Sequence, residues 1–299
     1  MTAPTKPAGP VGEGRRGFTP FETGVRYEDV TITAEDGTPM TGWLFLSEAD
    51  APAILACGGY RGKRSDLLGI SSALWRAGFN VLLFDYRGHG DLSTDDSRNG
   101  TRHPVTLGYR ELADARAALR FLRDRFPAAP LGVIGFSMGA AIALMVAAHE
   151  PAVRAVIADS PFSTQREIVR YRLHRLAGPL ASRWTAPVGD AIITLADRRL
   201  RRRLGFRFAD VSPLRDVRRL SQPLLLIHGE QDRDVPPEHS RRLAAAAAEA
   251  GVPLETWFVP GAAHCAAYFL DRPHYCDRAT TFFRRHLTPA PVPAAAPPS

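Results

Sequence analysis

Short apolar runs alternate with longer stretches of helical periodicity along most of the chain. Six such runs cover residues 53–56, 81–84, 131–135, 153–158, 224–227 and 254–259. Strands that are apolar along their whole length are typical of a parallel sheet buried on both faces. Because helical stretches lie between the runs, the pattern predicts an α/β fold, a mostly parallel twisted sheet with helices on both faces.

Two further patterns place elements around this sheet. Residues 25–33 alternate between apolar and polar positions, residues 35–37 read Glu-Asp-Gly, and residues 40–46 give a second strand pattern. This is typical of an antiparallel hairpin, which we expect at the sheet edge. The helix expected after Thr106 carries an apolar stripe at spacings of three and four, formed by Leu112, Ala115, Leu119, Leu122 and Phe126. The stripe predicts one helix face packed on the sheet.

The third buried run leads directly into Gly-Phe-Ser-Met-Gly at residues 135–139, and an apolar run over residues 140–148 follows. The pattern G-x-S-x-G between a strand and a helix is that of a nucleophile elbow. A serine turned sharply out of a strand needs strained backbone, and side chains two residues to either side would collide with neighbouring chain. We therefore expect Ser137 to present its hydroxyl at the start of a helix.

A serine hydroxyl is a poor nucleophile at neutral pH and needs a base that a carboxylate orients. Residues at the carboxyl ends of parallel strands gather around the ligand site. Asp232 lies in residues 228–236 after the fifth run, and His264 follows the sixth run. The order serine, acid, histidine is that of hydrolases with this elbow. We expect Ser137 as nucleophile, His264 as base and Asp232 as orienting acid.

Two other aspartates compete with Asp232 for the role of the acid. Asp234 lies two residues further along the same segment, and Asp159 ends the strand after the elbow helix. Asp234 would otherwise be a turn or cap carboxylate, and Asp159 a buried turn-former before Ser160-Pro161. For His264 the alternative is an ordinary loop histidine.

Acyl transfer also needs backbone donors for the developing oxyanion. The N–H of Met138, directly after the nucleophile, is one expected donor. The other must come from the loop after the first run, which reads Cys-Gly-Gly-Tyr-Arg-Gly over residues 57–62. We assign it to the N–H of Tyr60, because the glycines before it let the backbone approach a substrate. The same glycines fit a tight strand-to-helix turn, and both interpretations can hold together.

Other polar residues near strand ends favour structural roles. Arg87 and His89 lie in residues 85–91 after the second run, and we expect them to brace the active-site loops. His228 follows four apolar residues and is expected to be a hydrogen-bonded strand-end histidine. The remaining His and Asp residues show no metal-ligand spacing, so we predict no metal and no cofactor.

Together these motifs resemble the α/β-hydrolase superfamily, in particular the cap-bearing serine hydrolases grouped with the serine aminopeptidase and acylaminoacyl-peptidase-like proteins. The resemblance spans residues 25–287 and is carried by segments 58–62, 85–90, 135–139, 159–162, 228–236 and 261–264. It implies the fold and the triad, whereas a shared fold says little about substrate. In one departure, Gly58-Gly59 stands after Cys57 where relatives usually carry His-Gly before the oxyanion residue. A loop-bracing group is therefore missing.

Length and composition bound the organisation of the chain. With 299 residues, 45% of them hydrophobic, it is long enough for one large α/β domain with an insertion. We expect the hydrolase core over residues 21–161 and 213–287, and a helical cap over 162–212. Residues 1–20 lack a periodic apolar pattern and residues 288–299 are mostly Pro and Ala, so both are predicted to be disordered tails.

The chain shows no sign of export or of a membrane span. It lacks the apolar stretch of roughly 7–15 residues of a signal peptide and the roughly 18 residues of a spanning helix. We therefore expect a soluble cytoplasmic protein. Three cysteines are too few for a disulfide framework, and we expect core or site-edge thiols at Cys57, Cys265 and Cys276.

The net charge of +7 is concentrated in the predicted cap. Residues 162–212 hold four acidic residues, and the rest of the chain has equal numbers of basic and acidic residues. The eleven arginines of the segment are Arg166, Arg170, Arg172, Arg175, Arg183, Arg198, Arg199, Arg201, Arg202, Arg203 and Arg207. A solvated helix face is the favoured interpretation. The alternative is attraction of an anionic substrate, an acyl carrier or, by peripheral membrane contact, a lipid surface. Nucleic acid is disfavoured, because no recognised binding module accompanies the arginines.

The predicted cap also carries an apolar side, which we expect over the pocket: Leu173, Leu176, Leu180, Trp184, Val188, Ile192, Ile193, Leu195, Leu200 and Leu204. A peptidase that binds a free amino terminus should need carboxylates there, and arginines outnumber them. We therefore predict a serine hydrolase acting on a small-molecule ester or thioester with a neutral acyl group or an anionic portion. The alternatives are an aminopeptidase-like amidase and a non-catalytic binding protein of the same fold. The oligomeric state stays open.

Overall fold

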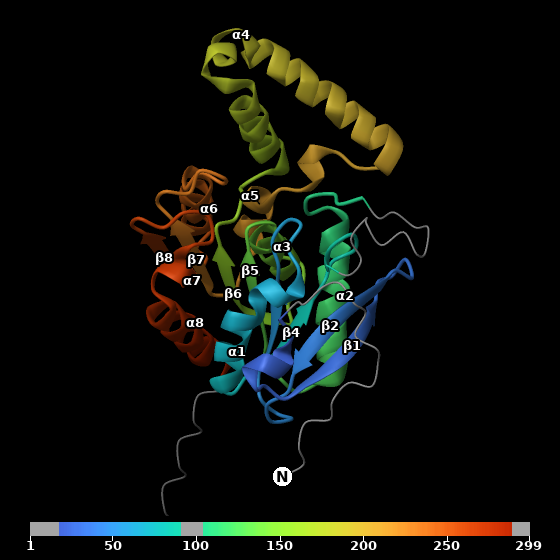
Figure 1. Ribbon diagram of the computed structural model, residues 1–299, viewed down its shortest axis with the longest axis vertical. Helices are drawn as coiled ribbons and strands as arrows, with labels where there is room; N and C mark the ends of the chain where they lie inside the picture. The colour runs from blue at the N-terminus through green and yellow to red at the C-terminus, as the bar shows by residue number, and fades with distance from the viewer. Residues whose placement is uncertain (1–17, 91–103, 289–299) are drawn as a thin grey trace, which may run out of the picture.

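The computed structural model describes residues 18–90 and 104–288, and over residues 177–188 the backbone alone. The strands described are β1 (Tyr27–Thr33), β2 (Pro39–Phe45), β3 (Ala53–Cys57), β4 (Asn80–Phe84), β5 (Leu131–Phe136), β6 (Val153–Asp159), β7 (Leu224–Gly229) and β8 (Leu254–Val259). They form one sheet in the order β1-β2-β4-β3-β5-β6-β7-β8 (Figure 1). The pairs β1–β2 and β2–β4 are antiparallel and the others parallel. The predicted mostly parallel sheet with an edge hairpin is confirmed.

The six apolar runs become β3 to β8, and each observed end lies within two residues of the predicted one. The α-helices among the described residues are α1 (Leu68–Arg76), α2 (Arg110–Arg125), α3 (Met138–Ala147), α4 (Gln165–Leu204), α5 (Pro213–Asp216), α6 (Glu238–Glu249), α7 (Ala267–Leu270) and α8 (Arg272–Leu287). Short 3-10 helices are η1 (Pro20–Thr23), η2 (Arg64–Leu67), η5 (Phe208–Asp210) and η6 (Val217–Arg219).

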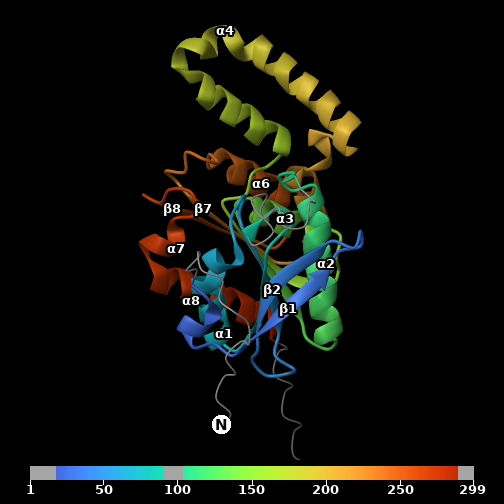
Figure 2. The same ribbon diagram turned by 45° about the vertical axis from the view of Figure 1, so that its right-hand side comes forward.

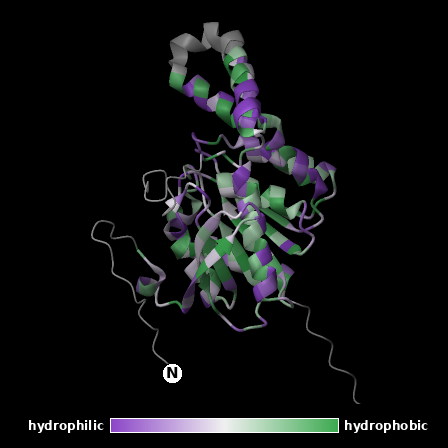
Figure 3. Ribbon diagram, turned by 90° about the vertical axis from the view of Figure 1, so that its right-hand side faces the viewer, coloured by the Kyte–Doolittle hydropathy of each residue, from purple (hydrophilic) through white to green (hydrophobic). Residues whose placement is uncertain are grey.

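Each face of the sheet has its own apolar cluster, and helices cover both. Leu55 of β3 belongs to the cluster that includes residues of α2, α3 and α6, whereas its neighbours Ile54 and Ala56 belong to the cluster with α1 and α8. Successive side chains of a strand point to opposite faces, which explains this division. The predicted stripe of α2 packs in the first cluster through Ala115 and Leu119. Figure 3 shows the hydrophobic colours gathered in the central body.

Helix α4 leaves the body, bends and returns toward it (Figures 1 and 2). The Thr164 hydroxyl accepts a hydrogen bond from the N–H of Glu167 at its start, and Gly205, with φ 77°, ends it. Pro179 and Pro187 lie inside the element, where a proline lacks the backbone N–H and kinks a helix. Helix α4 occupies most of residues 162–212. The predicted tails lie outside the described residues, apart from residues 18–20 and 288.

The turn between β5 and α3 leaves almost no room for side chains. Ser137 has φ 55° and ψ −116°, a strained backbone conformation for a residue other than glycine. A Cβ on Gly135 would lie 2.2 Å from the carbonyl oxygen of Gly139, and a Cβ on Gly139 would lie 2.2 Å from that of Cys57. The two glycines of the elbow therefore let α3 pack directly against the end of β3.

Replacing Gly139 by alanine should destabilise the fold, because the nearest obstacles are backbone atoms that cannot rotate away. We expect Gly139→Ala to lower the free energy of unfolding by about 1–3 kcal/mol in urea denaturation. Gly189→Ala in α4 is the matched control, since its Cβ would meet nothing closer than 3.7 Å. There alanine should raise stability by about 0.5–1 kcal/mol. Equal effects at the two sites would contradict this account.

Candidate active site

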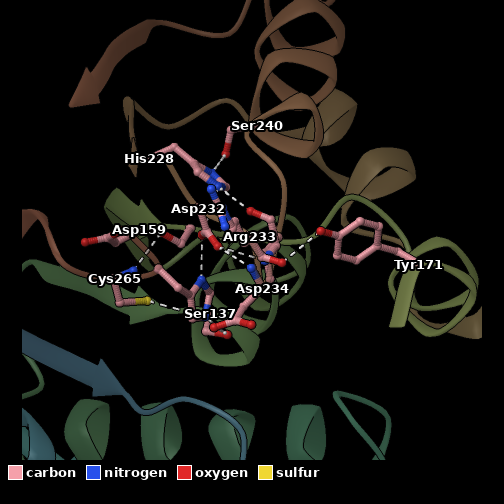
Figure 4. A network of polar contacts seen from close by, with 12 residues as sticks. Ser137, Asp159, Tyr171, His228, Asp232, Arg233, Asp234, Ser240 and Cys265 are labelled. Carbon is pink, nitrogen blue, oxygen red and sulfur yellow. Dashed lines mark hydrogen bonds and ion pairs between the residues drawn. The ribbon is translucent and has the colours of Figure 1, made fainter. Parts of the chain in front are cut away.

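Three loops at the carboxyl ends of β5, β7 and β8 bring Ser137, Asp232 and His264 together (Figure 4 labels Ser137 and Asp232). Nε2 of His264 lies 2.9 Å from Oγ of Ser137, and Nδ1 lies 2.6 Å from Oδ2 of Asp232. A carboxylate only accepts hydrogen bonds, so the network assigns the proton to Nδ1 and leaves Nε2 to accept from the serine hydroxyl. The three residues form a continuous chain of hydrogen bonds, as a serine nucleophile requires.

The Asp232 carboxylate is held by more than the histidine. Its Oδ1 accepts the N–H groups of Asp234 and Val235 at 2.8 and 2.9 Å. Burial by itself would raise the pKa of Asp232, but hydrogen bonds from His228 and His264 and the attraction of His264 outweigh it and hold the pKa well below its usual range. The carboxylate of Asp232 is therefore ionised at neutral pH, where it can orient the imidazole of His264.

The two competing aspartates have other partners. Asp159 is buried, and its carboxylate accepts the hydroxyls of Ser160 and Tyr275, both at 2.9 Å. Burial raises its pKa. The carboxylate of Asp234 lies 2.9 Å from Nη1 of Arg175 in α4. Of the three aspartates weighed from the sequence, only Asp232 hydrogen-bonds to His264.

His228 is a second histidine beside the Asp232 carboxylate. It is buried, its Nδ1 lies 2.7 Å from the Ser240 hydroxyl, and its Nε2 lies 2.8 Å from the carbonyl oxygen of Val235 and 3.2 Å from Oδ2 of Asp232. Both partners of Nε2 are acceptors, so Nε2 carries the proton. The predicted hydrogen-bonded strand-end histidine is confirmed. Its contact with Asp232 was missed, although the four-residue spacing across one turn was a signal for it.

The proposed oxyanion donors belong to the first turn of α3 and to the loop after β3. Met138 is the first residue of α3, where backbone N–H groups lack partners within the helix. Residues 57–62 pass beside Ser137, since a Cβ on Gly59 would lie 3.6 Å from the serine Cβ. Tyr60 lines the same cavity as Ser137. The roles of the Met138 and Tyr60 N–H groups stay predictions.

Arg87 and His89 brace loops outside this cavity. The buried Arg87 guanidinium lies 2.6 Å from Oδ1 of Asp114 and 2.6 Å from Oδ2 of Asp36, which ties α2 to the hairpin turn. Nδ1 of His89 lies 2.9 Å from the carbonyl oxygen of Arg87. Neither side chain lines the cavity that contains Ser137. The bracing interpretation of this segment is supported by these contacts.

Cys265 is a site-edge thiol, as expected for one of the cysteines. It lines the cavity, and its Sγ lies 3.8 Å from Nε2 of His264. Burial raises its pKa well above the usual range, so the thiol stays protonated. Cys57 is buried at the end of β3, and all three cysteines are free. Within residues 18–90 and 104–288, no cluster of three or more His, Cys or acidic side chains could hold a metal ion.

Residues 40–279 match a family model described as "Alpha/beta hydrolase family". The chain belongs to the alpha/beta hydrolase family. The uncharacterized protein Rv2307c of Mycobacterium tuberculosis is 32% identical to it over 268 residues, which cover 88% of this chain and 80% of that protein.

The solved structures that are similar in fold to this alpha/beta hydrolase include an esterase and a peptidase. The esterase Pf2001 of Pyrococcus furiosus has a TM-score of 0.70 at 23% identity, covering 96% of this chain and 100% of that one. An acylaminoacyl peptidase of Pyrococcus horikoshii has a TM-score of 0.66 at 17% identity, covering 91% of this chain and 43% of that one. At these identities the likeness is one of fold alone.

In this alpha/beta hydrolase, a cavity of about 360 Å³ opens beside Ser137 and His264. Helix α4 contributes Arg172 to its wall, and none of the described apolar residues of α4 lines it. Leu176, Ile192 and Leu195 are instead 85%, 50% and 67% exposed. The prediction that the apolar side of the cap lies over the pocket is therefore wrong for these residues. The predicted Leu180, Trp184 and Val188 lie outside the described side chains.

None of the described helices is long and apolar enough to cross a membrane.

The depressed pKa of Asp232 predicts a specific loss of stability in acid. Because the folded-state pKa is below the ordinary value of 3.8, the ionised group stabilises the fold above that pH and loses this effect as pH falls toward the folded-state pKa. Wild type should therefore lose more free energy of unfolding between pH 5 and about pH 3.5 than Asp232→Asn, by at most about 1.4 kcal/mol per pH unit. Urea denaturation at both pH values tests this. Parallel losses in the two proteins would contradict it.

Proposed function

We propose that this protein is a serine hydrolase that cleaves a carboxylic ester or thioester through an acyl-enzyme on Ser137. The observation that carries the proposal is the hydrogen-bonded chain Ser137–His264–Asp232 at the wall of a largely apolar cavity. Membership of the alpha/beta hydrolase family supports the same reaction class. An apolar wall suits the acyl or alcohol portion of an ester.

The geometry supports a two-step reaction. Ser137 Oγ attacks the substrate carbonyl carbon while Nε2 of His264 takes the hydroxyl proton, and the resulting oxyanion accepts the N–H groups of Met138 and Tyr60. Collapse breaks the bond to the leaving group, which receives the proton from His264. A water molecule then attacks the acyl-enzyme with His264 again as base, and the acid and free Ser137 are released. Asp232 keeps the imidazole oriented and stabilises its charged form.

In this proposal residues 162–212 act as the cap, with α4 attached to the turn that carries the acid. The Tyr171 hydroxyl donates to the carbonyl oxygen of Arg233 at 2.8 Å, and Arg175 pairs with Asp234 (Figure 4 shows the first contact). Arg175 also donates to the carbonyl oxygen of Arg233. These contacts hold the first part of α4 beside the cavity, where it can select substrates.

Labelling with a fluorophosphonate probe tests the nucleophile. Wild type should be labelled and should hydrolyse p-nitrophenyl esters, and Ser137→Ala should lose labelling and at least about 10⁴-fold in kcat. Thioesters and aminoacyl amides assayed in parallel separate the proposed hydrolase from an amidase. A chain that is not labelled and turns over none of these substrates would be a non-catalytic binding protein.

The acid is tested by two single substitutions in one turn. Asp232→Asn should lower kcat by about 10⁴-fold, because the amide favours the wrong tautomer of His264. Asp234→Asn is the matched control and should change kcat/KM by less than about fivefold, since an exposed ion pair such as that with Arg175 contributes at most about 1 kcal/mol. Near-normal turnover by Asp232→Asn would assign the acid elsewhere.

A further inference from the structure

The cavity beside Ser137 is mainly apolar but carries three charged residues. Its apolar wall is formed by side chains from η2, α1, the elbow and α7, namely Leu67, Ile70, Phe136, Tyr268 and Phe269. The charged lining residues are Asp66, Arg172 and Asp234. A charged side chain that has no partner within the protein can bind an opposite charge of a substrate. The partners of these three side chains therefore decide which substrate charge the cavity favours.

Both carboxylates have partners. Oδ2 of Asp66 accepts the N–H of Lys63 at 2.9 Å at the start of η2. Asp234 forms an ion pair with Arg175. The charge of Asp234 is therefore balanced by Arg175, whereas the partner of Asp66 is a neutral N–H group.

Arg172 is the exception among the charged residues of the cavity. It forms no hydrogen bond or ion pair with any residue that the structure describes, and its guanidinium lies over the Tyr60 ring, 5.7 Å from the centroid. Arg170 and Arg175, two and three residues away on α4, are paired with Asp190 and Asp234. An aromatic face attracts a guanidinium without using its N–H groups, so the five donors of Arg172 stay available.

A second guanidinium meets the same ring. Arg61 lies 5.2 Å from the Tyr60 centroid and likewise has no ion pair among the described residues. Two guanidinium groups, one from the loop after β3 and one from α4, thus lie over the Tyr60 ring. The backbone N–H of Tyr60 is also a proposed oxyanion donor. Planar guanidinium groups bind carboxylates through two parallel hydrogen bonds.

We infer that the preferred substrate is an ester or thioester that bears a carboxylate, which Arg172 binds while the apolar portion contacts the cavity wall. The inference rests on the proposed function and adds the class of substrate to it. Arg172 is then a specificity-determining residue, and Arg61 supplies a second positive charge at the same ring.

Matched ester pairs test the inference. Mono-p-nitrophenyl glutarate and p-nitrophenyl valerate differ by a carboxylate in place of the terminal methyl. The butyrate esters of 4-hydroxybenzoate and of methyl 4-hydroxybenzoate differ by a carboxylate in place of a neutral methyl ester on the leaving group. In at least one pair, wild type should prefer the anionic ester, and Arg172→Gln should lower the anionic-to-neutral ratio of kcat/KM by about 10- to 100-fold.

Two further variants separate a local contact from the general positive field. Arg172→Lys keeps the charge but not the planar fork, and should restore part of the ratio. Arg199→Gln removes an equal charge from an exposed position on α4 and should leave the ratio unchanged. Equal falls for Arg172→Gln and Arg199→Gln, or a ratio that does not respond to Arg172→Gln in either pair, would overturn the inference.

A binding measurement keeps this test separate from the reaction. Calorimetric titration of Ser137→Ala with the anionic ester of the responding pair, or with both anionic esters if no ester is turned over, should give a Kd about 10- to 100-fold weaker after Arg172→Gln is added. If the chain hydrolyses esters and is labelled by the probe but its Kd for the anionic ester does not depend on Arg172, this inference is overturned and the proposed function stands. Binding that depends on Arg172 in a chain without labelling or turnover would support it and overturn the proposed function.

Discussion

The close contact between the first turn of α3 and the end of β3 determines where the candidate nucleophile lies. Gly139 has no space for a Cβ beside the carbonyl oxygens of Cys57 and Gly58. Because α3 is pressed so near to β3, the chain must leave β5 through a sharp turn, and Ser137 takes a positive φ. The same contact places the loop after β3 beside the serine. One packing constraint thus sets both the position of the hydroxyl and the backbone that faces it.

The turn after β7 links Asp232, the proposed acid, to α4. The backbone N–H groups of Asp234 and Val235 donate to Asp232, which directs that carboxylate inward to His264. Asp234 points its carboxylate to Arg175 instead, and the carbonyl oxygen of Arg233 accepts the Tyr171 hydroxyl. A shift of α4 would therefore act on the same few residues that orient the acid. The proposed substrate selection by α4 and the orientation of the Asp232 carboxylate therefore depend on the same turn.

Local patterns predicted the fold and much of the site. All six runs became strands, and β3, β4, β5 and β7 are buried along almost their whole length, whereas the edge strand β8 is only partly buried. The elbow could be predicted because its two glycines are recognisable within five residues of sequence, although the backbone that Gly139 approaches is that of residues 57 and 58. Asp232 and Asp234 could not be separated with certainty from the sequence, since both lie in one turn and differ only in the direction of their side chains. His228 was assigned to a strand end correctly, but its contact with Asp232 depends on how the turn folds back.

In the arginine-rich residues 162–212, the number of arginines did not predict which of them borders the site. Eleven arginines predicted a charged surface, yet a guanidinium acts on a substrate only where it lacks an internal partner and borders the site. Arg170 and Arg175 are paired, whereas Arg172 lies between them in sequence, has no hydrogen bond or ion pair with the described residues, and lies over an aromatic ring. Likewise, apolar residues of α4 were expected over the pocket, but Leu176 and Leu195 are exposed and do not line it. Position along a bent helix, rather than composition, decides which side chains reach the cavity.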